Sequence, residues 1–140
     1  MDPTIWAKAH GATTHFPLAL ALSSVVFDAA GLAQARKPVG NDLRAVGYWT
    51  MICGAIGTVP AVLSGLLMTK GTVMGHDTLR LHHLFVWPAF ALLAALGAWR
   101  LIQGRQTSDR VSATYLVLAG LAAALMTTAA YWGGEMMIAR

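Results

Sequence analysis

The chain has 140 residues, of which 56% are hydrophobic and only 11% are charged, and its net charge is +4. Soluble domains carry about 25% charged residues, so this composition excludes an ordinary soluble enzyme domain and a disordered tail. The ten Lys and Arg residues stand at the ends of apolar runs and form no basic face, which excludes a nucleic-acid binder. The single cysteine cannot form an intrachain disulfide or a Cys-x-x-Cys motif.

Four apolar segments follow one another along the chain and are expected to form membrane-spanning helices. They cover residues 14–35, 45–68, 81–102 and 112–138, and each has about the 20 residues that a helix needs to cross the hydrocarbon core. The connections are short and polar and contain Gly, Pro and Asn, so consecutive helices are expected to run antiparallel. The sequence therefore predicts an all-α integral membrane protein. Its single domain, residues 1–140, is an up-down-up-down four-helix bundle in which no internal repeat is visible.

Basic residues near the helix ends predict the orientation of this bundle. With four crossings, both termini lie on the same side of the membrane as the loop between the second and third helices. That side carries Lys8, Lys70, Arg80 and Arg140, and the opposite side carries Arg36, Lys37, Arg44, Arg100, Arg105 and Arg110. Because the more basic side faces the cytoplasm, we expect both termini on the outer side.

All five histidines fall on the side of the termini. His10 and His15 stand near the start of the first helix, His76 lies in the second loop, and His82 and His83 begin the third helix. A neutral imidazole is a common metal ligand, and haem b needs one or two axial ligands in a slot between helices. His15 and His82 are the expected ligands, because each lies just inside the same membrane boundary. His83 is the alternative to His82, whereas His10, turned about 140° from His15, is expected nearer to water.

Two other interpretations of the histidines stay open. They could be interfacial side chains that form hydrogen bonds with headgroups and water. They could also belong to a zinc or copper site, with Asp77 beside His76 as a further ligand. However, neither a cysteine nor a His-Glu-x-x-His motif stands near them.

Asp28 is an ionisable residue within the first apolar segment, and such residues mark functional sites in membranes. It follows His15 by thirteen residues, about 20 Å along a helix, and is therefore expected to belong to a different site. Arg44, Arg100 and Arg110 lie near the same membrane face. Asp28 is expected either to form a structural ion pair with one of them or to take part in a proton path.

Two polar residues near the end of the fourth helix are further candidates. Glu135 lies in the leaflet of the histidines, where it could accept a hydrogen bond from an imidazole or bind a quinol hydroxyl. Tyr131 stands one turn earlier and could donate a hydrogen bond at the same site. Each could also be an ordinary interfacial side chain.

The sequence His-Gly-Ala-Thr-Thr-His-Phe-Pro at residues 10–17 resembles the opening of a bacterial family of small four-helix predicted membrane proteins of unknown function. Members begin with His-Pro, three residues and His-Phe-Pro, and their first apolar run ends near an Asp that Asp28 matches. His82, the Ser-Gly pair at 64–65 and the Tyr-Trp-Gly-Gly-Glu segment at 131–135 also match. The resemblance covers nearly the whole chain.

The chain departs from the family pattern at two points. Gly11 replaces the usual Pro, and the His that follows the Gly-Gly segment in other members is missing. Some members are fused to Rieske iron–sulfur domains, which implies a role in electron transfer. The resemblance also implies a bacterial inner (plasma) membrane, so that the outer side with both termini would be the periplasm.

These features predict a membrane-embedded electron-transfer subunit, and a quinone-linked oxidoreductase complex is the kind of enzyme to which such a subunit would belong. Haem b would lie between the first and third helices near the outer face, bound by His15 and by His82 or His83. Electrons would pass between a periplasmic partner and the quinone pool, with a quinone near Glu135 and Tyr131. The partners would be the lipid bilayer and either other subunits of a redox complex or further copies of the chain. A cofactor-free structural or anchor subunit and an oligomeric transporter or metal-handling protein are the alternatives.

Overall fold

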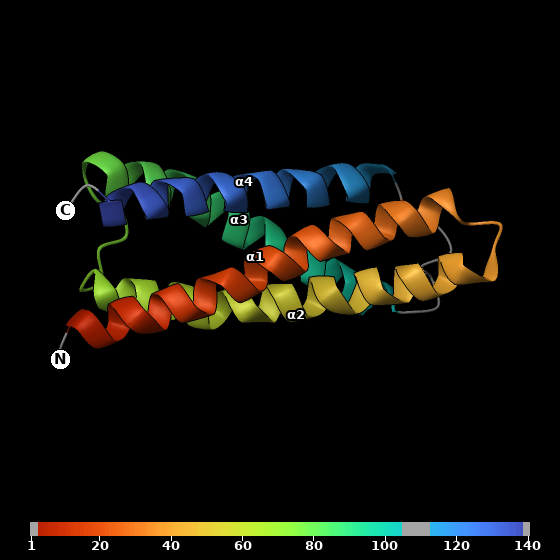
Figure 1. Cartoon of the computed structure of the whole chain (residues 1–140), viewed down its shortest axis with the longest axis horizontal. Coiled ribbons are helices and arrows are strands. Elements are labelled where there is room, and N and C mark those ends of the chain that lie inside the picture. The colour runs from red at the N-terminus through yellow and green to blue at the C-terminus, as the bar shows by residue number, and fades with distance from the viewer. Residues whose placement is uncertain (1–2, 105–112, 139–140) are drawn as a thin grey trace.

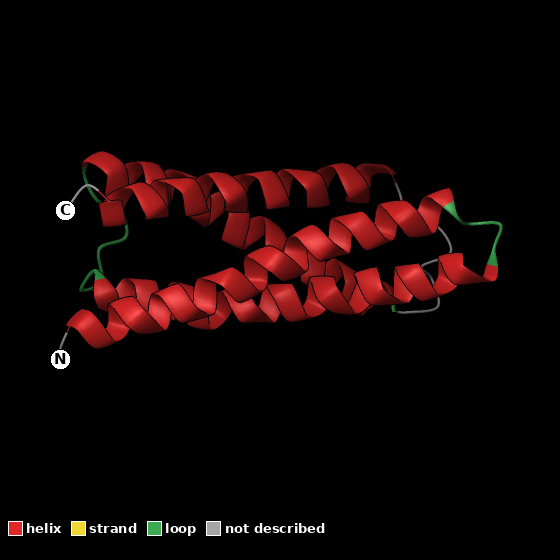
Figure 2. Cartoon of the chain, in the orientation of Figure 1, coloured by secondary structure: helices red, strands yellow, loops and turns green. Residues whose placement is uncertain are grey.

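The computed structural model describes residues 3–104 and 113–138, and nearly all of them lie in four long helices (Figure 1). The helices are α1 (Pro3–Ala33), α2 (Pro38–Met68), α3 (Asp77–Gln103) and α4 (Ala113–Ile138). The described residues contain no strand (Figure 2). Each helix is long and apolar enough to cross a membrane, so the protein is an all-α membrane bundle, as the sequence predicts.

The helices extend beyond some of the apolar segments that predict them. α1 begins at Pro3 and α2 at Pro38, several residues before the predicted starts at 14 and 45. An apolar run marks the part of a helix inside hydrocarbon, whereas the backbone stays helical through the polar boundary. Pro38 can begin α2 because a proline at the first helical position lacks only an N–H that would have no partner there. The predicted start of the fourth helix, residue 112, lies outside the described residues.

The bundle consists of two helical hairpins. α1 packs mainly along α2 and forms the first hairpin, and α3 packs mainly along α4 and forms the second. The hairpins touch through α2 against α3 and α1 against α4, which leaves α1 and α3 on one diagonal of the bundle. The beginning of α1 and the end of α4 lie at the same end of the molecule (Figure 1).

Apolar side chains face both the inside and the outside of this bundle. The core is made of Ala21, Met51, Leu93, Leu96, Tyr115, Ala119 and Ala122. Large side chains such as Phe16 and Val117, 61% and 70% exposed, cover the outer surface. A membrane protein needs apolar atoms on both surfaces, because lipid tails surround it. Polar side chains inside the bundle are therefore the exceptions that require an explanation.

Candidate functional site

Two imidazole rings face one another at the end of the bundle that holds the termini. His10 on α1 and His82 on α3 are half-buried, and their ring centres are 6.4 Å apart with an angle of 83° between the ring planes. α1 and α3 lie on a diagonal of the bundle. The two rings therefore approach each other across the interface between the hairpins, and we call them the imidazole pair.

Each ring of the imidazole pair is held by a backbone carbonyl of its own hairpin. Nδ1 of His10 lies 2.9 Å from the carbonyl oxygen of Ala61, and Nδ1 of His82 lies 2.8 Å from that of Ala129. A carbonyl oxygen only accepts hydrogen bonds, so both Nδ1 atoms carry the proton. In the neutral rings, each Nε2 then has a free lone pair, which is the tautomer that binds a metal.

Small residues leave the space that the imidazole pair occupies. A Cβ atom added at Gly65 would lie 2.9 Å from Cε1 of His10, and one at Gly133 would lie 3.4 Å from Nδ1 of His82. His10 has a further polar neighbour, since its Nδ1 is 3.3 Å from the hydroxyl of Ser64. Each ring thus lies over a glycine one turn beyond the carbonyl that it contacts.

The structure places the two histidines of α1 differently from the prediction. His15 is exposed on the outside of the bundle, whereas His10, which we expected nearer to water, points inward. Five residues turn a helix by about 140°, so only one of the two histidines can face α3. The prediction that His15 shares a slot with His82 is therefore wrong.

The remaining histidines have other surroundings. His83 is buried, and its Nδ1 accepts a hydrogen bond of 3.2 Å from the backbone N–H of Gly75. Its proton is then on Nε2, so His83 offers no free nitrogen in its neutral form. His76 and the neighbouring Asp77 are exposed. Across residues 3–104 and 113–138, no three His, Cys, Asp or Glu side chains form a group that could hold a metal ion.

Glu135 and Tyr131 lie away from the imidazole pair. Tyr131 is 59% exposed and contacts the ring of Trp132, and Glu135 is half-buried. The backbone of Gly133 faces His82, and each of the two residues is two positions from it, about 200° around the helix. Both side chains are therefore on the other side of α4.

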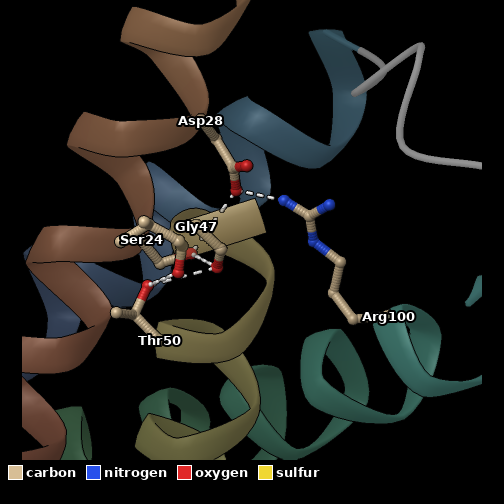
Figure 3. A network of polar contacts seen from close by, with 6 residues as sticks. Ser24, Asp28, Gly47, Thr50 and Arg100 are labelled. Atoms are coloured by element: carbon tan, nitrogen blue, oxygen red, sulfur yellow. Dashed lines mark hydrogen bonds and ion pairs between the residues drawn. The ribbon is translucent and has the colours of Figure 1, made fainter. Parts of the chain in front are cut away.

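A second polar group lies at the opposite end of the bundle. Asp28 on α1 is completely buried, and its carboxylate forms an ion pair with the guanidinium of Arg100 on α3, which is 5% exposed (Figure 3). The hydroxyl of Ser24 donates to the carbonyl oxygen of Gly47 at 2.9 Å and lies 3.4 Å from the Asp28 carboxylate. An ion pair was one of the two alternatives that the sequence left open for Asp28, and the structure shows it with Arg100. Arg110 lies outside the described residues.

All four helices meet at this ion pair. The carboxylate of Asp28 rests against Gly47 on α2, where an added Cβ would overlap it. The guanidinium of Arg100 stacks on the ring of Tyr115 on α4, at 4.3 Å from the ring centre. Arg44 is also buried at this end, and it donates a hydrogen bond of 2.5 Å to Asn41. The group therefore links the two hairpins through charged side chains.

Comparison with known protein families identifies the chain. A sequence model of the family described as "Predicted membrane protein (DUF2231)" matches residues 8–139, and the chain belongs to this family. The resemblance of its opening motif is thereby confirmed. No curated protein and no solved structure matches the chain significantly.

Proposed function

We propose that this member of the family binds haem b between its two hairpins, where His10 and His82 would hold it, and serves as a membrane electron-transfer subunit. The imidazole pair is the observation that carries this proposal. Imidazole nitrogens bind metals at about 2 Å. When the ring radii are added, two imidazoles that hold one metal would have their ring centres up to about 6 Å apart, close to the observed 6.4 Å.

The number and form of the candidate ligands also favour haem. A haem iron takes up to two axial ligands from the protein, and the bundle offers two imidazoles with Nε2 unprotonated. Structural zinc sites use four ligands and catalytic zinc sites three. The backbone carbonyls of Ala61 and Ala129 would orient the rings and increase their basicity, as outer partners of metal-bound histidines do.

The bound haem would supply one-electron chemistry, and the chain's own residues would hold and shield it. Gly65 and Gly133 leave space for the rings, and Ser64 and Thr13 form a polar contact beside His10, with 3.3 Å between their hydroxyl oxygens. The corresponding neighbourhood of His82 contains the ring of His83. The unequal surroundings would tune the reduction potential through hydrogen bonding and burial.

The proposal includes an orientation and a place in a redox chain. The loop charges favour an orientation with both termini on the outer side, although Arg105, Arg110 and Arg140 in that count lie outside the described residues. With the bacterial inner membrane that the family resemblance implies, the outer side would be the periplasm. The imidazole pair would then lie near the periplasmic face and exchange electrons with a periplasmic partner and the quinone pool. A quinone near Glu135 and Tyr131 would sit on the outer surface of α4 rather than between the hairpins.

Absorption spectroscopy of three variants tests the proposal. Protein purified in detergent from haem-replete cells is expected to show a Soret band, which His10→Ala and His82→Ala should abolish. His15→Ala is the matched control, because His15 is exposed on the same helix as His10. Loss of the band in the His15 variant but not in the His10 variant would overturn the assigned ligands. Colourless parent protein would reject haem binding and favour the cofactor-free subunit.

A further inference from the structure

The two polar groups have the same spacing on α1 and on α3. His10 and Asp28 are 18 residues apart on α1, and His82 and Arg100 are 18 residues apart on α3. Eighteen residues make five turns of an α-helix, so both members of each pair lie on the same face, about 27 Å apart. The imidazole pair and the ion pair therefore stand at opposite ends of the bundle, and each of them joins α1 to α3 across the interface between the hairpins.

The equivalence extends along much of the inner face of these helices. The residues of α1 from Ile5 to Gly31 have counterparts 72 positions later on α3, and 72 is also the separation of Asp28 and Arg100. Four buried residues of each helix follow this rule: Pro17, Ala21, Ser24 and Asp28 on α1, and Ala89, Leu93, Leu96 and Arg100 on α3. Gly31, His83 and Gly97 are also buried, but their counterparts are not. At these positions, α1 and α3 thus face the bundle interior with equivalent residues.

α2 and α4 are equivalent in the same way. His10 reaches a carbonyl 51 residues later and His82 reaches one 47 residues later, so the counterparts on α4 follow those on α2 by 68 positions. The equivalent pairs are Gly47 and Tyr115, Met51 and Ala119, Gly54 and Ala122, Ala61 and Ala129, and Gly65 and Gly133. All ten residues are buried except Gly65 and Gly133, which are half-buried and lie against the rings of His10 and His82. At these positions the second hairpin therefore presents equivalent residues to the bundle interior, although Tyr48, Ile52, Thr58 and Ser64 on α2 are buried and their counterparts on α4 are only half-buried.

The equivalent positions at the end opposite the histidines carry opposite charges. Asp28 and Arg100 occupy one position of the repeat, and together they join the first hairpin to the second. Apolar contacts between membrane helices receive no hydrophobic driving force, because lipid tails are equally apolar. A buried carboxylate and guanidinium do favour one arrangement of the helices. Breaking their contact would leave two charges unpaired in a medium of low dielectric constant.

We propose that the chain is a duplicated helical hairpin in which Asp28 and Arg100 are positioning residues that set the height of one hairpin against the other. Because His10 and His82 stand five turns away on both helices, matched charges at one end bring matched imidazoles together at the other. A slip of one helical turn, about 5.4 Å, would separate rings whose centres are now 6.4 Å apart. This inference concerns the imidazole pair on which the proposed function rests.

Thiol cross-linking tests the positioning role without haem. The parent protein for this experiment carries Cys53→Ser, to remove the natural thiol, together with His10→Cys and His82→Cys. A short bifunctional thiol reagent joins the two cysteines only in the correct register, and a long reagent also joins them after a slip. In the parent, both reagents are expected to cross-link efficiently.

The informative variant adds Asp28→Leu and Arg100→Met, which removes both charges and strands neither, so that the bundle can still fold. We expect cross-linking by the short reagent to fall several-fold while cross-linking by the long reagent and the helical circular dichroism persist. Unchanged short-reagent cross-linking would show that apolar packing sets the register and would overturn the proposal. Asp42→Asn is the control, because Asp42 is an exposed carboxylate at the same end of α2, and it should leave both reactions unchanged.

The outcome can be told apart from that of the haem experiment. The cross-linking measurement needs no cofactor, so a colourless protein that loses register in the double variant would reject haem binding and support the positioning role. A protein with a histidine-dependent Soret band and unchanged short-reagent cross-linking would support haem binding and reject the positioning role.

Discussion

Gly47→Ala is the smallest change that should disrupt the ion pair between the hairpins. A Cβ atom at this position would overlap Oδ1 of Asp28 and lie 2.6 Å from its Cγ and 3.1 Å from Oδ2. Because all three atoms of the carboxylate group are involved, rotating the group about its own axis cannot relieve the overlap. The carboxylate would have to move away from α2, and with it from its present contact with Arg100.

The expected loss of stability combines two opposing effects. Breaking a buried ion pair so that one charge stays unpaired costs about 3–5 kcal/mol. Alanine is a better helix former than glycine and returns about 1 kcal/mol. The free energy of unfolding should therefore fall by about 2–4 kcal/mol.

Unfolding in mixed micelles, followed by circular dichroism as the fraction of denaturing detergent rises, measures this loss. Gly120→Ala is the matched control, since no atom lies within 4 Å of a Cβ added to Gly120 on α4. That variant should be as stable as the parent or more stable, by up to about 1 kcal/mol. Equal stability of the two alanine variants would refute the argument that the carboxylate needs the glycine.

Three further changes test the contacts of the imidazole pair, of the ion pair and of the loop between α2 and α3. Gly65→Ala should lower the haem content per protein more than Gly134→Ala, because its Cβ would lie 2.9 Å from the facing imidazole whereas the control position is open. Tyr115→Leu should reduce the free energy of unfolding by about 1–2 kcal/mol more than Tyr115→Phe, since both variants lose the hydroxyl but only Phe keeps a ring that stacks on the buried guanidinium, now 4.3 Å from the ring centre; equal losses would contradict this. Trp87→Phe removes a hydrogen bond of 2.8 Å to a carbonyl of the loop between α2 and α3. Limited proteolysis should then cut that loop faster, and an unchanged rate would show that the bond does not hold it.

The sequence was sufficient for the architecture because membrane insertion leaves few options. Four apolar runs of sufficient length predict four helices, and short connections predict their antiparallel order. The ion pair of Asp28 was also predictable, since a carboxylate in hydrocarbon needs a cationic partner. The starts of the first two helices could not be predicted from the sequence. An apolar run shows which part of a helix lies in lipid, and the backbone can be helical beyond that part.

The rotation of each helix about its axis could not be inferred from hydropathy, because lipid and core are both apolar and the side chains on every face look alike. We placed His15 inside the bundle from its depth along the helix, and depth does not determine direction. Buried charge does. Asp28 must face inward, and a residue 18 positions before it, His10, shares its face, whereas His15, 13 positions before it, is turned about 140° away. The same rule applied to Arg100 selects His82 over His83. In a helix surrounded by lipid, one buried ion pair can therefore define the inner face for every other polar residue.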